Sequence, residues 1–324
     1  TLVLFLDGMA SRLTNAVLYA SIPDLSIPYF LATAITEGAR RTHGRLIIVL
    51  TSPVFADSQA VSHAATWKLV QTLLTFVYVQ TTKVAQEMNK ILLEVDVLLR
   101  GPHDAAPEYP TPPEAVFYVD GDSIEIPSAF ATLPRFVLPR ESARRTEAVV
   151  LDTAHHHPSM YPVVALGGTF DHLHAGHKIL LSVAAWLASS KLIIGITSDA
   201  LLTRKTYASV LESLSQRKSV TERFMRAFRP DLVYDLVEIS DVYGPTGWDP
   251  DIQALVVSKE TLSGADAIAT HRAAQNLPAL ETFVIDVIST TSTSLSETDA
   301  DALRQAKMSS TYIRQWIAEN QRST

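Results

Sequence analysis

The chain has no cysteine among its 324 residues. Disulfide bonds and cysteine-ligated zinc sites are therefore excluded, and the composition fits a reducing compartment. Positive charge is also scarce, because 27 lysines and arginines stand against 34 acidic residues and the net charge is −7. A general nucleic-acid-binding protein would carry a basic surface, so we expect no nucleic-acid partner. We expect a cytoplasmic protein, with the nucleus as a second location.

Long apolar runs are missing as well. The best membrane candidate, residues 69–82, is uncharged but is interrupted by Gln71, Thr72 and Gln80. It falls short of the roughly 20 residues that a spanning helix needs. We interpret it as a buried core helix and expect no membrane partner. The apolar residues before Asp7 are too few for a signal peptide and follow no basic residue.

Two glycine fingerprints of nucleotide-binding proteins are absent. The sequence contains neither Gly-x-Gly-x-x-Gly nor Gly-x-x-x-x-Gly-Lys-Ser/Thr. The first pattern binds dinucleotides, and the second cradles phosphates in P-loop enzymes. A nucleotide site in this chain must therefore be built from other residues.

The first 126 residues alternate apolar runs with helical stretches. Such alternation predicts a small α/β domain. We expect strands at Leu2–Leu6, Leu46–Leu50, Val95–Leu99 and Val116–Val119, and helices at Pro28–Gly38 and within 58–95. Residues 127–162 are rich in proline, arginine and histidine, and we interpret them as a linker. His155–His157 within it fit a solvated loop better than a metal site, since successive residues do not converge easily on one ion.

Residues 163–324 predict a second domain, of the order β-α-β-α-β-β-α-β-α. We expect strands at Val163–Leu166, Leu192–Thr197, Leu232–Ile239, Ala254–Val257 and Thr282–Val287, and helices near Lys178–Ala188, Gln216–Phe228, Ala265–Asn276 and Ser310–Glu319. This order predicts an α/β fold with a doubly wound, Rossmann-like parallel sheet. In such sheets the ligand loops follow the carboxyl ends of the strands.

The most informative stretch follows the first strand of this second domain. Gly167 and Gly168 let the backbone approach a bulky anion, and Gly176 lets the chain turn tightly into a helix. The first turn of that helix offers free N–H groups and the positive end of the helix dipole. His174 and His177 would face the same ligand, as the α-phosphate of a triphosphate requires. The alternative is a histidine pair that satisfies the backbone of the turn.

A second polar element opens the last helix. Ser309, Ser310 and Thr311 lie between Lys307 and Arg314. Hydroxyls at a helix start normally cap it, but three of them with two cations exceed what capping requires. The serine- and threonine-rich residues 289–296 before this element are either a mobile connector or a loop that orders when ATP binds.

Together these two elements resemble the His-x-Gly-His nucleotidyltransferase superfamily. Within it, the chain is most similar to phosphopantetheine adenylyltransferases of the eukaryotic type, as in the corresponding domain of coenzyme A synthase. The resemblance runs from about Val163 to Asn320 and includes Asp241–Pro250 and Leu255–Thr261. It implies that ATP and 4′-phosphopantetheine react to dephospho-coenzyme A and pyrophosphate. It further implies Mg²⁺ as the partner of ATP, no metal ligand from the protein, and association with other enzymes of coenzyme A synthesis.

The resemblance also implies roles for particular residues. Those expected to be catalytic are His177, Thr169 and Lys205. Those expected to bind ATP are Gly167, Gly168, Thr169, Phe170, His174, Gly176, His177, Ser258, Lys259, Glu260, Thr261, Lys307, Ser309, Ser310 and Thr311. Those expected to bind phosphopantetheine are Thr169, Lys205, Asp241, Tyr243 and Gly244. Ser258–Thr261 replace an Arg-Gly-x-Arg run of the bacterial branch, which leaves the roles of Lys259 and Arg272 open.

Other assignments stay open at this point. A cytidylyltransferase or a pyridine-nucleotide adenylyltransferase would share the fold, and class I aminoacyl-tRNA synthetases share both short motifs. A non-catalytic nucleotide-binding protein, with the N-terminal domain as its working part, is the alternative from another class. The sequence indicates neither a role for residues 1–150 nor an oligomeric state.

Overall fold

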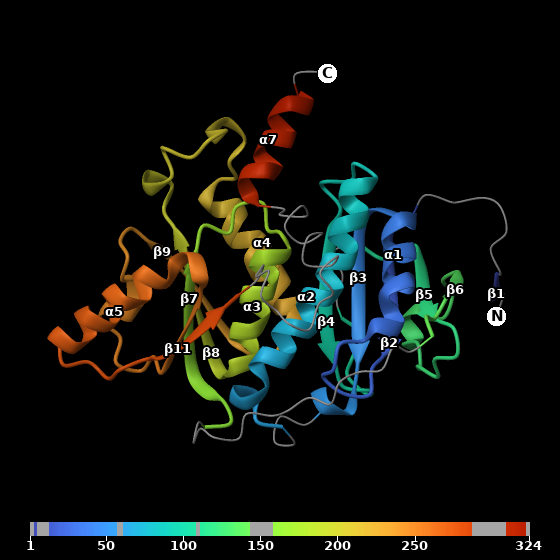
Figure 1. Cartoon of the computed structure of the whole chain (residues 1–324), viewed down its shortest axis with the longest axis horizontal. Coiled ribbons are helices and arrows are strands. Elements are labelled where there is room, and N and C mark those ends of the chain that lie inside the picture. The colour runs from blue at the N-terminus through green and yellow to red at the C-terminus, as the bar shows by residue number, and fades with distance from the viewer. Residues whose placement is uncertain are drawn as a thin grey trace. The chain divides into compact units, whose positions relative to one another are not determined.

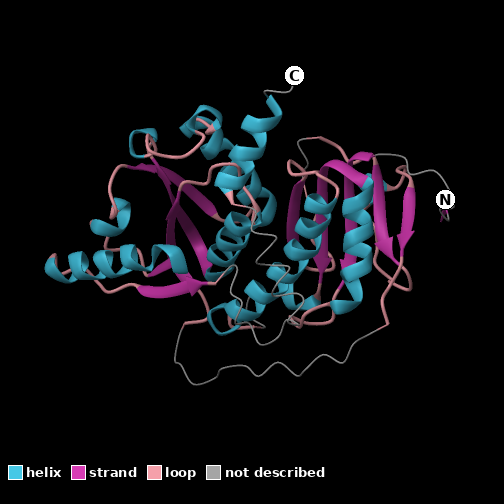
Figure 2. Ribbon diagram, turned by 45° about the horizontal axis from the view of Figure 1, so that its top comes forward, coloured by secondary structure: helices cyan, strands magenta, loops and turns pink. Residues whose placement is uncertain are grey.

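The computed structural model describes residues 3–4, 13–56, 61–107, 111–142, 158–286 and 309–321. Its contacts divide the chain into two compact units, Thr1–His156 and His157–Thr324. Figure 1 follows the chain from the N-terminal unit in blue to the C-terminal helix in red. Each unit contains its own parallel β-sheet with helices packed on it, as Figure 2 shows.

The first unit is built on a six-stranded sheet of order β1-β6-β5-β2-β3-β4. All neighbouring strands in it are parallel. Five consecutive residues are buried in each of the neighbouring strands β2 and β3, as expected of parallel strands that are buried on both faces. The strands are β1 Val3–Leu4, β2 Leu13–Ser21, β3 Thr42–Thr51, β4 Glu94–Arg100, β5 Ala115–Val119 and β6 Arg135–Leu138.

Two α-helices accompany this sheet, α1 at Ala32–Arg41 and α2 at His63–Glu87, and they pack against each other. Residues 69–82 lie inside α2, and Val70, Leu73 and Val77 are fully buried. The interpretation of this stretch as a core helix is therefore confirmed. Among the helices that the structure describes, none has the length and apolarity needed to cross a membrane.

The first unit differs from the sequence-based expectation in two places. Its central strand β2 was not predicted. Of the strand expected at Leu2–Leu6, the described residues Val3–Leu4 form β1. The second difference is β6, which lies inside the expected linker. Phe136 and Leu138 of β6 are buried although prolines flank the strand; proline is tolerated at strand ends. Residues 143–157, with His155–His157, lie outside the described residues.

The second unit confirms the predicted doubly wound parallel sheet. Its five strands have the order β11-β10-β7-β8-β9, and all neighbours are parallel. The strands are β7 Tyr161–Gly168, β8 Ala188–Thr197, β9 Val233–Ile239, β10 Ala254–Ser258 and β11 Glu281–Ile285. The helices are α3 Ala175–Leu187, α4 Leu214–Phe228, α5 Leu262–Ala274 and α7 Ser310–Asn320. The serine-rich stretch 289–296 lies outside the described residues.

The strand order of the second sheet places the glycine turn at a topological switch. The chain runs from β7 to β8 and β9 on one side, and β10 then returns to the other side of β7. Ligands of such sheets bind outside the carboxyl ends of the strands at this switch. Gly167 and Gly168 end β7, so the predicted phosphate-binding turn lies at that position.

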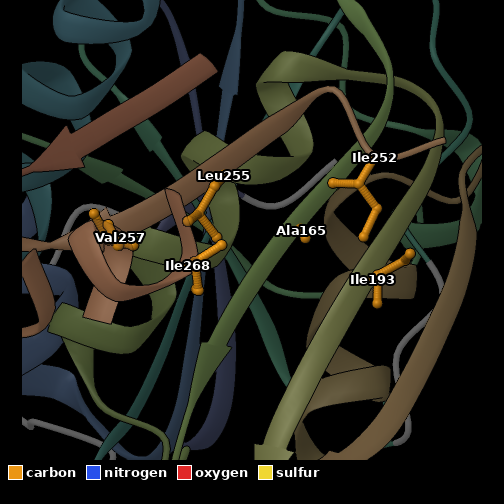
Figure 3. Packing of buried hydrophobic residues seen from close by; sticks show 7 residues of the cluster. Ala165, Ile193, Ile252, Leu255, Val257 and Ile268 are labelled. Carbon is orange, nitrogen blue, oxygen red and sulfur yellow. The ribbon is translucent and has the colours of Figure 1, made fainter. Parts of the chain in front are cut away.

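A hydrophobic cluster supports the sheet below this turn. Ile252 is fully buried against Ala165 of β7 and Ile193 of β8, while Leu255 and Val257 of β10 and Ile268 of α5 complete the layer (Figure 3). Because Ile252 lies two residues before β10, its buried side chain helps to fix the start of the strand at the switch.

We predict that Ile252→Ala lowers the free energy of unfolding of the second unit by about 2–5 kcal/mol, the usual cost of truncating a buried isoleucine. The control is Val233→Ala, at a position that is 63% exposed, which should change it by less than about 0.5 kcal/mol. Urea unfolding followed by tryptophan fluorescence reports mainly on this unit, because it holds Trp186, Trp248 and Trp316 of the four tryptophans. Equal effects of the two substitutions would contradict the assignment of the core.

Candidate active site

The glycine turn after β7 has a strained backbone. Phe170 and His172 have φ values of +52° and +43°, a left-handed region that non-glycine residues rarely adopt. Phe170 is fully buried, and a Cβ added to Gly168 would lie 3.1 Å from its ring. Gly168 is therefore needed for packing against Phe170, in addition to its expected role beside an anion. Such strain is commonly kept at functional sites.

The two predicted histidines lie together at the start of α3. His174 is the N-cap, and its Nδ1 accepts a hydrogen bond from the Gly176 backbone N–H at 3.2 Å. Its ring stacks on that of His177 with 3.9 Å between ring centroids. The Nδ1 atom of His177 is buried without a hydrogen-bond partner among the described residues. Because a native structure leaves few buried polar atoms unsatisfied, His177 is suited to receive a polar ligand.

The electrostatic surroundings keep both histidines neutral at pH 7. Burial, together with the nearby charge of Lys178, lowers the pKa of His174 from 6.5 to about 4. Burial, His174 and Lys178 also lower the pKa of His177 well below 6.5. Each ring therefore carries one N–H donor at neutral pH. A bound anion would favour the protonated forms, since an opposite charge stabilises the charged state.

The start of α7 lies directly beside the glycine turn. The Ser310 hydroxyl donates a hydrogen bond to the Asp171 backbone carbonyl at 2.8 Å. Ser309 is the N-cap and accepts from the Tyr312 backbone N–H at 3.3 Å, while the Thr311 hydroxyl accepts from Arg314 Nη2 at 3.1 Å. All three hydroxyls thus have structural partners. A hydroxyl has two lone pairs and one proton, so each can also contact a ligand. Lys307 lies outside the described residues.

A buried ion pair fixes α7 to the turn. Arg314 Nη1 pairs with the carboxylate of Asp171, and the side chains are 2% and 0% exposed. Arg314 Nε also donates to the Thr206 carbonyl at 2.9 Å, and Asp171 Oδ1 accepts from the Glu212 backbone N–H at 2.9 Å. Sequence reasoning assigned no role to Asp171. Its place in the glycine motif was the available signal, but its partner is 143 residues away.

A second buried arginine holds the other side of the turn. Arg217 Nη1 donates to the carbonyls of Thr169 at 2.8 Å and Thr197 at 2.9 Å. Its Nη2 pairs with Asp199, and its Nε donates to the Glu212 carbonyl at 3.1 Å. Arg217 therefore ties the predicted catalytic residue Thr169 to the carboxyl end of β8. Arg217 was not predicted as a site residue, because its partners are mostly backbone carbonyls that carry no sequence signal.

The loops expected to bind phosphopantetheine follow β8 and β9. Lys205 is exposed in a turn where its backbone N–H donates to the Leu202 carbonyl at 3.0 Å. Asp241 closes the next loop by accepting from the backbone N–H groups of Tyr243 and Gly244 at 2.9 and 2.7 Å. Gly244 has a φ of +49°, where glycine is favoured. Both loops extend from the same carboxyl edge as the histidines, because the strands are parallel.

The segment expected to bind the ribose and adenine follows β10. The hydroxyls of Ser258 and Thr261 lie 3.2 Å apart. Lys259 pairs with Asp286. Glu260 is the middle residue of the short helical turn Lys259–Thr261. Direct contacts therefore join the glycine turn, the histidines and α7. Strand order alone brings Lys205, Asp241–Gly244 and Ser258–Thr261 to the same edge.

The open question about Arg272 has a structural answer. Arg272 is 1% exposed, and its Nη1 donates to the carbonyls of Thr246 and Asp249 at 2.6 and 3.0 Å. Its Nε donates to the Pro278 carbonyl at 2.7 Å. Arg272 therefore holds the loop after β9 through the backbone carbonyls of that loop, which is a structural role.

The fold and this arrangement define a class of protein. Residues 165–316 match the family model described as cytidylyltransferase-like, which places the second unit among the nucleotidyltransferases.

Known relatives narrow the class to a family. A phosphopantetheine adenylyltransferase of Pyrobaculum aerophilum is 39% identical over 126 residues, which cover 39% of this chain and 79% of that protein. A phosphopantetheine adenylyltransferase of Saccharomyces cerevisiae is 45% identical over 128 residues, 40% of this chain and 42% of the yeast protein. An uncharacterized protein of Schizosaccharomyces pombe is 39% identical over 157 residues, 48% of each chain. This chain belongs to the phosphopantetheine adenylyltransferase family, although its matches span less than half the length of the two fungal proteins.

The neutral histidines generate a prediction about pH. Because the pKa of His174 is about 4 in the folded state and about 6.5 when unfolded, the unfolded chain binds more protons between these values. The free energy of unfolding therefore falls as pH is lowered from about 6.5 to about 4. In His174→Asn, which keeps an N-cap acceptor, we expect a smaller fall, measured by urea unfolding at a series of pH values. Identical pH dependence in both proteins would show that His174 has an ordinary pKa.

Proposed function

We propose that the second unit transfers the adenylyl group of ATP to 4′-phosphopantetheine, producing dephospho-coenzyme A and pyrophosphate. The observation that carries this proposal is the stacked pair His174–His177 at the start of α3, joined through Asp171 to the hydroxyls at the start of α7. Two helix starts with their free N–H groups thus meet at one switch point, which suits a polyphosphate. Several relatives are named phosphopantetheine adenylyltransferase, which supports ATP and 4′-phosphopantetheine as the two substrates.

The proposed adenylyl transfer requires the enzyme to position its substrates, and it does not require a general base. The attacking group is a phosphate monoester whose second pKa is about 6, so near pH 7 it is mostly a dianion and needs no proton removed. The enzyme has to align two anions and stabilise the charge that develops on the α-phosphate and on pyrophosphate. The donors at this site, which are neutral imidazoles, hydroxyls and backbone N–H groups, match that task.

We assign the roles along the triphosphate as follows. His177 donates to the α-phosphate, with Thr169 held beside the transferred group by Arg217. His174 and the backbone of Gly167, Gly168, Phe170 and Gly176 line the triphosphate. Ser309, Ser310, Thr311 and Lys307 hold the β- and γ-phosphates.

We assign the other substrate groups to the loops after β8, β9 and β10. Lys205 receives the phosphate of phosphopantetheine, and Asp241–Gly244 border its pantetheine arm. Ser258–Thr261 receive the ribose and adenine. Mg²⁺ enters with ATP as part of the substrate, since this hard cation prefers phosphate oxygens and water. A cytoplasmic location and association with other enzymes of coenzyme A synthesis stay predictions.

We predict that His177→Ala lowers kcat about 10²–10³-fold, the usual effect of removing one donor to a transition state. The assay is the reverse reaction, ATP formation from pyrophosphate and dephospho-coenzyme A. The control is His103→Ala, an exposed histidine of the first unit, which should retain wild-type turnover. Near wild-type turnover of His177→Ala would exclude His177 as the donor. A wild-type protein without activity in this assay would favour a nucleotide-binding role or another acceptor.

A second pair of variants separates the two ends of the site. Ser310→Ala with Thr311→Ala should raise the KM for ATP or lower kcat, because two hydroxyls beside the turn are lost. The KM for phosphopantetheine should stay within about threefold, a shift under about 1 kcal/mol. Lys205→Ala should raise the KM for phosphopantetheine and leave the KM for ATP within about threefold. If both variants weaken phosphopantetheine and spare ATP, the assignment of the two ends is reversed.

A further inference from the structure

The loop that carries Lys205 has little apolar contact to hold it in place. We call residues 203–212, which follow β8, the Lys205 loop. Residues 203–209 are all exposed, and Tyr207 has a φ of +56°, which a non-glycine residue rarely adopts. Because exposed segments with few buried contacts open easily, contacts from outside the loop have to fix its shape.

The end of the Lys205 loop is fastened to the glycine turn. His172 Nε2 donates a hydrogen bond to the Val210 carbonyl at 2.7 Å. The Glu212 carboxylate accepts from the His172 backbone N–H at 2.7 Å, and the Glu212 backbone N–H donates to Asp171. All of these contacts lie after the exposed residues 203–209, so they do not support the part of the loop that holds Lys205.

Arg314 of α7 supports that part of the loop. Its Nε donates to the Thr206 carbonyl at 2.9 Å. Among the hydrogen bonds of the described residues, this is the one that joins residues 203–209 to a residue distant along the chain. Helix α7 also packs against Ala208–Val210. Because Thr206 follows Lys205 directly, and consecutive Cα atoms lie only about 3.8 Å apart, the contact with Arg314 sets the position of the Lys205 backbone.

The same guanidinium group reaches the part of the site to which we assign the triphosphate. Its Nη1 pairs with the Asp171 carboxylate, and its Nη2 donates to the Thr311 hydroxyl at 3.1 Å. The planar guanidinium fixes the directions of its donors relative to one another. One buried side chain therefore holds the glycine turn, the start of α7 and the Lys205 loop in a single arrangement.

From these contacts we infer that Arg314 is a positioning residue for the second substrate, because it holds Lys205 where the phosphate monoester of phosphopantetheine binds. The inference rests on the function proposed above, which assigns this phosphate to Lys205. It gives α7 a second task, since the helix whose first hydroxyls face the triphosphate also sets the affinity for the other substrate. Arg314 acts without touching either substrate, as its side chain is 2% exposed.

Limited proteolysis with trypsin tests the hold on the loop without any substrate. Trypsin cleaves after arginine and lysine alike, so Arg314→Lys leaves the number of cleavable residues unchanged, and the exposed Arg204 and Lys205 report opening of the loop. In Arg314→Lys we expect cleavage after these two residues at least tenfold faster than in the wild type, because the cleavage rate follows the population of the open form. The control Arg226→Lys, at a side chain that is 60% exposed, should be cleaved at the wild-type rate. Unchanged cleavage in Arg314→Lys would overturn the inference.

Steady-state kinetics of adenylyl transfer test the consequence for the substrate. The substitution Arg314→Lys keeps a positive charge for Asp171 but loses the fork of donors. We expect the KM for phosphopantetheine to rise at least tenfold and the KM for ATP to stay within about threefold. Equal rises would mean that α7 as a whole has loosened, and an unchanged KM for phosphopantetheine would mean that its binding does not depend on the loop. Either result overturns the inference.

A second variant covers the case in which Arg314→Lys is not folded by circular dichroism. The double variant Asp171→Asn with Arg314→Gln leaves no unpaired buried charge, but its amide has too few donors for three partners. It should show the same faster cleavage after Arg204 and Lys205, and wild-type cleavage would overturn the inference. If the wild type transfers no adenylyl group, the function proposed above fails, whereas the trypsin result still decides whether Arg314 holds the loop.

Discussion

The candidate active site depends on the buried ion pair between Asp171 and Arg314. The two residues are 143 positions apart, and each belongs to a different half of the site. Removing one partner of such a pair leaves an uncompensated buried charge, which typically costs about 3–5 kcal/mol. The Ser310–Asp171 hydrogen bond lies beside the pair. The histidines of α3 and the hydroxyls of α7 therefore form one site as long as this pair is intact.

Arg217 extends the same principle to the next strand. Its bonds to the carbonyls of Thr169 and Thr197 fix the ends of β7 and β8 relative to each other. Donors that are held before the substrate arrives need no reorganisation during the reaction, which is how enzymes stabilise developing charge. In this family member, two buried arginines supply the framework, and the neutral imidazoles, hydroxyls and backbone N–H groups beside them are the groups that we propose to bind the substrate.

The sequence predicted the parts of this architecture that have local signals. The strands of the second unit, the glycine turn and the histidines follow from apolar runs and short motifs, and the helix at Ser310 follows from its cap. The partners of Arg217, Arg272 and Arg314 could not be predicted, since most are backbone carbonyls or residues distant along the chain. In the first unit, β2 was missed because the polar residues Thr14 and Asn15 lie near its start. Strand β6 was missed because prolines flank it.

The most direct test of the role of the Asp171–Arg314 ion pair is hydrogen exchange of the α7 amides in the variant Asp171→Asn. The substituted residue is far from this helix along the chain. If the ion pair holds α7 on the glycine turn, the amides of residues 313–320 exchange at least tenfold faster than in the wild type, a loss of about 1.4 kcal/mol or more of local stability. The amides of α5, which does not contact the pair, keep their wild-type rates. Unchanged protection of α7 in this variant would contradict the account, because the two halves of the site would then be held together by something else.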